Sequence, residues 1–164
     1  MSQSQSPPSG WNRTVWFTAL VFAVVGALLQ WWRMTSLTSS MDQGILYQIL
    51  WNGLQGHPFE STLSSQLSTN VVHAGELPSI GYHRLGQHFT PILLLWLPLI
   101  AVLGPWTLPL LQVALISGAG LLLYQLAKGL VKRDLATMLT LAFYGANAVI
   151  GPMLGNFSDF SQLP

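Results

Sequence analysis

Apolar and polar residues fall into blocks along the chain, and the first apolar block is long enough to cross a membrane. Thr14–Trp32 carries no charged side chain over 19 positions. Because a helix rises about 1.5 Å per residue, about 20 apolar residues cross the hydrocarbon layer of a bilayer. Trp31, Trp32 and Arg33 stand where a secretory signal would have a small-residue cleavage site. The pattern therefore predicts an uncleaved first transmembrane helix over residues 14–32.

Two later apolar blocks predict two more transmembrane helices. One covers Leu108–Ala127, and the other covers Leu135–Gly155 with Asn147 and Pro152 inside it. The first of these blocks contains a patch of small residues, which allows two helices to approach closely. The patch consists of Ser117, Gly118 and Gly120. We therefore expect spans at about residues 108–127 and 135–155.

A fourth apolar block, at about residues 91–104, is too short to cross. Ile92–Leu103 has only 12 residues, Pro98 interrupts it, and Gly104 with Pro105 closes it. Segments of this length are more often re-entrant or interfacial than spanning. The pattern predicts a re-entrant or juxtamembrane helix here.

A mostly polar stretch, about residues 34–90, separates the first span from this short block. Within it, Gly44–Leu54 has apolar side chains at helical spacing. These are Ile45, Leu46, Ile49, Leu50 and Leu54. The stretch from His57 to Gly86 has no clear period. We expect a large loop containing one helix, either docked on the rest of the protein or lying on the membrane surface.

Composition agrees with a membrane protein. Hydrophobic residues make up 51% of the chain and charged residues 7%, whereas a soluble domain has about 25% charged residues. The formal net charge of +1 gives no reason to expect nucleic-acid binding. The absence of cysteine excludes disulfides and thiolate metal sites. Seven tryptophans suit a protein anchored at membrane–water interfaces.

The basic residues predict the orientation in the membrane. Lys128, Lys132 and Arg133 are three of the six basic residues, and cytoplasmic connections are rich in such residues. If the short block does not cross, residues 1–13 form a disordered cytoplasmic tail and residues 34–90 an extracytoplasmic loop. We therefore predict an all-α integral membrane protein with three transmembrane helices, one re-entrant or juxtamembrane helix and a large extracytoplasmic loop.

This topology places two carboxylates, Asp42 and Asp159, on the outer side at the ends of spans. A carboxylate held at a helix end can act as a general base toward a hydroxyl group, although a solvated loop residue has the same sequence signal. Arg33 and Arg84 are outer-side cations that either bind phosphate or extend toward lipid headgroups.

The histidines raise the question of a divalent metal. All four lie in the outer loop, with three carboxylates that share its side of the membrane. These residues are His57, His73, His83 and His88, with Asp42, Glu60 and Glu76. Their spacings match no known ligand motif, so we assign no metal ligand. A divalent cation is the one cofactor that they leave open.

Three motifs resemble those of a bacterial membrane family known only as a domain of unknown function. The first motif is carried by Asp42-Gln43-Gly44-Ile45, then Gln48, Leu50-Trp51 and Gly56. The second is carried by His88-Phe89-Thr90-Pro91 and Leu97-Pro98, and the third by Asn156-Phe157-Ser158-Asp159-Phe160. That family is similar to the GT-C superfamily of glycosyltransferases, which includes protein mannosyltransferases and lipid A aminoarabinose transferases.

The resemblance implies a donor and a set of roles. GT-C enzymes take sugars from polyprenyl-phosphate carriers, and Asp42 matches their first-loop catalytic carboxylate. Asp159 matches their second acidic position, and His88 lies in a His-Phe motif without an assigned role. Ser158 departs from the pattern, because the family often has histidine there. GT-C proteins also have many more helices, so we expect this chain to be the N-terminal portion of a longer protein.

Two functions follow as expectations. The first is the N-terminal membrane module of a GT-C-like glycosyltransferase in the bacterial inner membrane, with membrane lipid and a polyprenyl-phosphate-linked sugar as its partners. Its phosphate would be bound by Arg33, Arg84 or His88, and the fragment alone would be inactive. The alternative is a small non-enzymatic subunit that packs on a larger complex through its Trp-rich surfaces and its small-residue patch.

Overall fold

The computed structural model describes residues 12–68, 83–84 and 90–155, and this part of the chain is helical apart from turns and one isolated β-bridge. The bridge pairs Glu60 with His83. The helices, in chain order, are α1 (Arg13–Thr35), α2 (Met41–Leu54), α3 (Thr62–Ser68), η2 (Pro91–Trp96), α4 (Leu97–Leu103), η3 (Gly104–Trp106), α5 (Thr107–Leu130), α6 (Arg133–Gly145) and α7 (Asn147–Leu154). The helical class expected from the sequence is confirmed.

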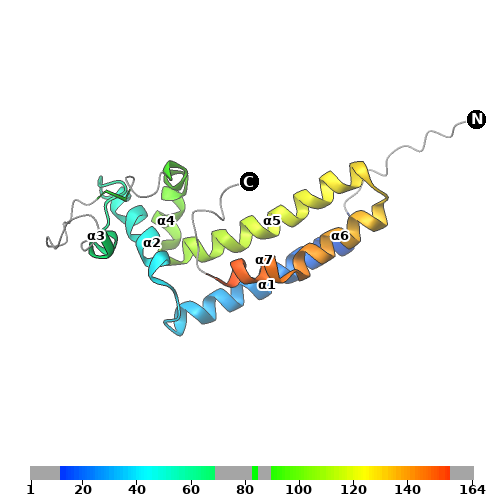
Figure 1. The fold of residues 1–164 in the computed structure, drawn as a ribbon, viewed down its shortest axis with the longest axis horizontal. Coiled ribbons are helices and arrows are strands. Elements are labelled where there is room, and N and C mark those ends of the chain that lie inside the picture. The colour runs from blue at the N-terminus through cyan, green and yellow to red at the C-terminus, as the bar shows by residue number, and fades with distance from the viewer. Residues whose placement is uncertain (1–11, 69–82, 85–89, 156–164) are drawn as a thin grey trace, which may run out of the picture.

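The long helices form an elongated bundle in which α1 and α5 lie along each other and α6 and α7 pack beside them (Figure 1). Helix α1 has 23 residues and α5 has 24, so each is about 35 Å long at about 1.5 Å per residue. Two helical runs are long and apolar enough to cross a membrane, and α6 with α7 makes a third if that bent pair is one span. The protein therefore has two or three candidate spans.

The third predicted span, residues 135–155, is broken rather than continuous. Helix α6 ends at Gly145, α7 begins at Asn147, and their axes differ by 43°. Ala146 between them has an extended backbone (ψ 131°), and its carbonyl accepts the first hydrogen bonds of α7 from Val149 and Ile150. Glycine and asparagine are weak helix formers, and here they flank the break.

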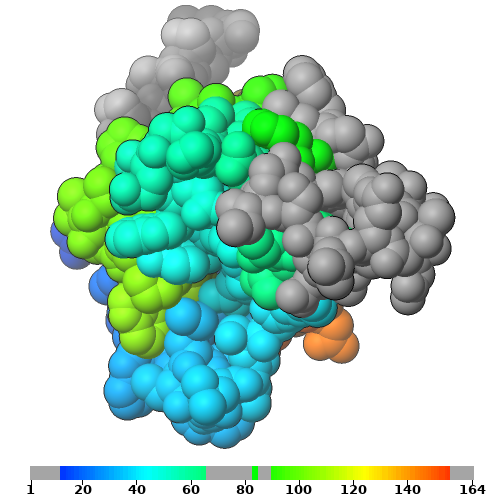
Figure 2. Space-filling view, turned by 90° about the vertical axis from the view of Figure 1, so that its left-hand side faces the viewer, coloured from blue at the N-terminus to red at the C-terminus, as the bar shows by residue number. Residues whose placement is uncertain are grey.

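One end of the bundle is covered by α2, α3, η2 and α4, which we call the cap (Figure 1). Its apolar core continues into the first turns of α5, so the cap is anchored on the bundle. The buried core consists of Ile45, Leu46, Ile49, Leu50, Phe59, Leu93, Ile100, Leu108 and Leu111. Figure 2 looks onto this end, where α2 lies near the centre of the view and the end of α1 below it.

The short apolar block near residues 91–104 forms η2 and α4, and α4 packs on α2 in the cap. Pro98 stands in the first turn of α4, where its missing N–H costs no hydrogen bond. The helix ends at Leu103, and Gly104 after it has a φ of 56°, which favours glycine. Large apolar side chains of this segment are exposed, among them Leu95 on η2 and Val102 on α4. A position at the membrane surface stays a prediction for this segment.

The predicted loop between His57 and Gly86 contains an additional helix, so that expectation was wrong in part. Helix α3 begins where the Ser61 hydroxyl accepts a hydrogen bond from the Ser64 amide at 3.1 Å. The side chain of Gln48, on α2, accepts from Ser61 and from the Leu63 amide. These contacts come from a different helix, which explains why the local pattern around Thr62 did not predict α3.

The small-residue patch predicted for helix contact is used within the chain. A side-chain carbon on Gly120 would lie 2.3 Å from the ring of Tyr144 on α6, so a larger residue there would force Tyr144 or its helix to move. The Tyr144 hydroxyl donates to the carbonyl of Ser117 at 2.6 Å. Gly118 has no atom within 4 Å of the corresponding position. Close packing is therefore confirmed for Ser117 and Gly120.

Candidate functional site at the capped end

Asp42 is displayed by the start of α2. The Ser40 hydroxyl caps this helix by accepting from the Gln43 amide at 3.3 Å. Asp42 follows in the first turn and is exposed, whereas Gln43 and Ile45 face inward and are buried. Among the residues that the structure describes, none forms a hydrogen bond or an ion pair with the Asp42 carboxylate. The position stabilises the carboxylate, because anions interact favourably with helix N-termini. It also leaves the carboxylate accessible to a ligand.

A polar clamp holds the carbonyl end of α7. Gln30 and Arg33 from α1, together with Gln112 from α5, donate to the last carbonyls of that helix. The acceptors are the carbonyls of Pro152, Met153 and Leu154, and Arg33 also donates to Gly155 at 2.7 Å. A helix end buried in a membrane protein needs such donors, because lipid supplies none. These hydrogen bonds explain why the polar residues Gln30 and Gln112 stand within apolar blocks.

Arg33 also ties this clamp to the turn before α2. Its second terminal nitrogen donates to the Thr38 carbonyl at 3.4 Å. The described chain therefore reaches Gly155 beside the turn that leads into Asp42. Asp159, the second predicted carboxylate, lies outside the described residues. The structure gives Arg33 a packing role, and its predicted role in substrate binding stays a prediction.

The clamp predicts a selective loss of stability. We expect Arg33→Met to lower the thermal midpoint by about 4 °C or more, because it removes charge-assisted hydrogen bonds worth about 1.5–3 kcal/mol. The control is Arg13→Met, at an exposed position of the same helix. Thermal melting followed by circular dichroism in detergent compares the two. Equal midpoints for both variants would contradict a structural role for Arg33.

Arg84 is placed in the cap beside α3. Its backbone N–H donates to the Phe59 carbonyl at 2.9 Å, and its Nη1 donates to the Ser64 hydroxyl at 3.2 Å. The residue is only 9% exposed. Phe59 has a φ of 65°, a conformation that is strained for an aromatic residue and persists only when its surroundings fix it.

The histidines that the structure describes form a small cluster with Glu60. One carboxylate oxygen lies 3.4 Å from Nδ1 of His57, and the other lies 3.6 Å from Nε2 of His83. Within the described residues, no group of three or more histidine or acidic side chains is arranged to hold a metal ion. His73, Glu76 and His88 lie outside the described residues, so the metal question stays open.

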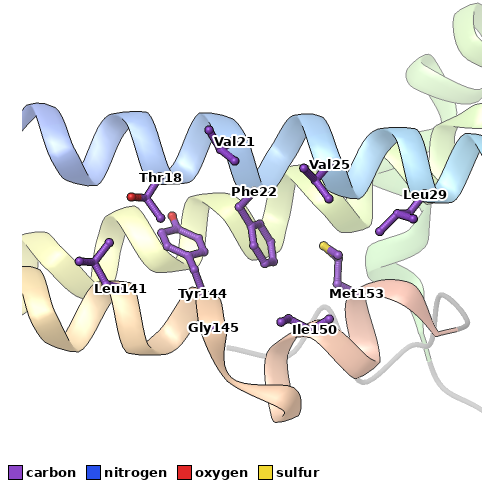
Figure 3. A pocket seen from close by; sticks show the side chains of 10 residues that line it. All are labelled: Thr18, Val21, Phe22, Val25, Leu29, Leu141, Tyr144, Gly145, Ile150 and Met153. Carbon is purple, nitrogen blue, oxygen red and sulfur yellow. The ribbon is translucent and has the colours of Figure 1, made fainter.

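An apolar groove of about 380 Å³ lies between α1 and the broken helix α6–α7 (Figure 3). Phe22 and Tyr144 meet in it with ring centroids 4.9 Å apart. At its other end Leu29 and Met153 line the groove, and the Met153 carbonyl belongs to the clamp described above. The groove therefore leads along α1 toward the capped end.

Comparison with known families decides where this chain belongs. Residues 33–164 match the family described as "Predicted membrane protein (DUF2079)". The chain belongs to this family. No curated protein and no solved structure matches it.

The match to DUF2079 begins at Arg33, the last member of the clamp on α1. It includes the whole cap, with Asp42 and Arg84, and it includes the α6–α7 break. The groove-lining residues of α1, from Thr18 to Leu29, lie before the first matched residue, so they are outside the family match. The family description supports a membrane protein and assigns no chemistry.

Proposed function

We propose that this chain is the N-terminal membrane module of a GT-C-like glycosyltransferase whose donor is a polyprenyl-phosphate-linked sugar. The observation that carries the proposal is the placement of Asp42. Its carboxylate is exposed in the first turn of α2, directly after the turn that leaves α1, and no described residue neutralises it. A carboxylate beside a membrane helix end is suited to a substrate that is itself held in the membrane.

The chemistry assigned to Asp42 is general-base catalysis. The carboxylate takes the proton of an acceptor hydroxyl, and the hydroxyl oxygen attacks the anomeric carbon of the sugar. The bond from that carbon to the phosphate oxygen breaks, and polyprenyl phosphate leaves with the bonding electrons. Cationic groups stabilise the negative charge that develops on the leaving phosphate. Arg84, His88 and Arg33 are the candidates, and Asp159 is the proposed second carboxylate.

The groove along α1 supports a lipid-linked donor. Its lining is almost entirely apolar, from Val21 and Phe22 to Ile150 and Met153 (Figure 3). A hydrocarbon chain lying there would direct its polar end toward the cap. A water-soluble nucleotide sugar would make no use of such a groove. The apolar groove therefore supports a lipid-linked donor, for which we propose an isoprenoid carrier.

The proposed orientation puts the cap outside the bacterial inner membrane and the N-terminus in the cytoplasm. It is supported by Lys128, Lys132 and Arg133, which lie at the bundle end opposite the cap. The cysteine-free chain allows a direct test. We expect Ser39→Cys to react with a membrane-impermeant maleimide in intact spheroplasts, and Gly129→Cys only after permeabilisation. The reverse labelling pattern would contradict this orientation.

The activity itself is tested on the lipid-linked sugars of the native host. Deleting the gene is expected to raise the labelled polyprenyl-phosphate sugar pool, because consumption of the donor stops. Cells are labelled with a radioactive sugar, and the organic-solvent-soluble fraction is separated by chromatography. A pool of unchanged size and composition would count against a transferase.

The alternative is a non-enzymatic subunit that packs on a larger complex through its Trp-rich surfaces and its small-residue patch. Within the chain, Gly120 lies against the Tyr144 ring, and the Ser117 carbonyl accepts from the Tyr144 hydroxyl, so part of the patch already has a partner. We place the transferase first because the Asp42 carboxylate is exposed at the start of α2.

A further inference from the structure

Arg84 is a buried cation whose guanidinium is incompletely paired. The residue is only 9% exposed, and its Nε has no hydrogen-bond partner. The one described side chain that accepts from it is the hydroxyl of Ser64, on α3. A buried guanidinium with an unsatisfied donor is costly unless an anion completes its shell.

The described side chain that Arg84 contacts is a hydroxyl rather than a counter-charge. Ser64, which accepts from Nη1 of Arg84, is 0% exposed. The nearest described carboxylate along the chain, Glu60, directs its two oxygens at His57 and His83. Among the described residues, no acidic side chain pairs with Arg84. A cation beside a neutral hydroxyl is suited to an oxyanion, because both groups can donate to oxygen.

We propose that Arg84 and Ser64 bind the phosphate group of a lipid-linked ligand in the cap. The planar guanidinium matches two phosphate oxygens at once, and the unpaired Nε is one of the donors that such a pair uses. The assignment deepens the proposed function and rests on it, because it names the residue of that site that holds the phosphate. It also separates Arg84 from Arg33, whose terminal nitrogens donate to four acceptors within the chain.

The backbone holds Arg84 for this role. Its amide is bonded to the carbonyl of Phe59, whose φ of 65° is strained. The adjacent bridge between Glu60 and His83 fixes the same pair of segments. Two backbone restraints and the Ser64 contact therefore position the guanidinium before a ligand arrives. Such preorganisation lowers the entropy cost of binding.

The inference is tested by binding, measured apart from sugar transfer. The full-length protein in neutral phosphatidylcholine nanodiscs is titrated with farnesyl phosphate and, in a second arm, with inorganic phosphate. We expect saturable binding of farnesyl phosphate and a loss of about tenfold or more with Arg84→Gln, as for one charge-assisted pair. Arg13→Gln, an exposed arginine far from the cap, should bind as the wild type does.

The two arms separate the source of the phosphate. Binding of both probes, each weakened by Arg84→Gln, assigns a headgroup site that needs no lipid tail. Binding of farnesyl phosphate alone, weakened by the same change, assigns a lipid phosphate. Wild-type affinity in Arg84→Gln, or no binding of either probe to the wild type, would overturn the inference. If Arg84→Gln does not fold, Ser64→Ala tests the same site, because it keeps the buried cation. We expect Ser64→Ala to weaken binding of farnesyl phosphate severalfold.

Failure of the inference and failure of the proposed function give different results. If Arg84→Gln binds farnesyl phosphate normally while Asp42→Asn abolishes transfer, the phosphate assignment is wrong and the transferase stands. If Arg84→Gln loses binding while Asp42→Asn transfers sugar normally, the phosphate site stands and the general base is wrong.

Discussion

Replacing Asp42 by asparagine in the full-length protein is expected to abolish sugar transfer while leaving the folded protein in the membrane. Asparagine has the same shape but does not accept the proton of the acceptor hydroxyl. General-base catalysis contributes about 10²–10⁴-fold to a rate, so residual turnover should fall by at least about 100-fold. The measurement is the rate at which label leaves the polyprenyl-phosphate sugar pool in cells that carry only the variant.

The matched control is Asp134→Asn. Asp134 is also exposed and also occupies the first turn of a helix, α6, but it lies at the opposite end of the bundle. Both changes remove one negative charge from a helix N-terminus, so their effects on stability should be similar and small. Equal transfer rates in the two variants would contradict the role of Asp42.

Replacing Gly120 by valine is expected to cause the largest loss of stability. The first side-chain carbon would lie 2.3 Å from the Tyr144 ring, so α5 and α6 would separate or Tyr144 would turn away. Either response breaks the hydrogen bond from the tyrosine hydroxyl to Ser117. Overpacking of this kind costs about 1–3 kcal/mol, and occasionally more, before the lost hydrogen bond is added.

Gly118→Val provides the control for this experiment. Gly118 lies two residues away on α5, and no atom stands within 4 Å of its missing side chain. The two variants share the same change in helix propensity, so their difference reports the Tyr144 contact alone. Thermal melting in detergent and the yield of monodisperse protein compare them. A midpoint for Gly120→Val equal to that of Gly118→Val would contradict the packing.

The sequence predicted the spanning helices best where a long apolar run determines the structure. Residues 14–32 and 108–127 lie within α1 and α5, each of which begins one residue earlier and ends three residues later. The third run forms two helices bent by 43° rather than one straight helix, since hydropathy does not report the extended backbone at Ala146. Helix α3 was missed because Gln48 stabilises its start from another helix.

The candidate site was predictable only where it depends on local sequence. Asp42 follows an apolar run and a capping serine, and both signals are local. The clamp was not predicted, because Arg33 meets its acceptors at Leu154 and Gly155, which are more than 120 residues away. The sequence signal that could have indicated the clamp is the presence of two glutamines, Gln30 and Gln112, inside apolar blocks; both are buried in the structure. Burial of Arg84 likewise depends on tertiary packing against Ser64.

The central claim is that the cap receives a phosphate-linked lipid, and photocrosslinking tests it most directly. The full-length protein in proteoliposomes is irradiated with a polyprenyl phosphate that carries a diazirine beside the phosphate, and the labelled peptides are sequenced. The account predicts labelling of α2, α3 and the segment with Arg84, competed by unlabelled polyprenyl phosphate. Labelling confined to the Lys128–Arg133 end, or equal labelling by the matching uncharged isoprenol, would contradict it.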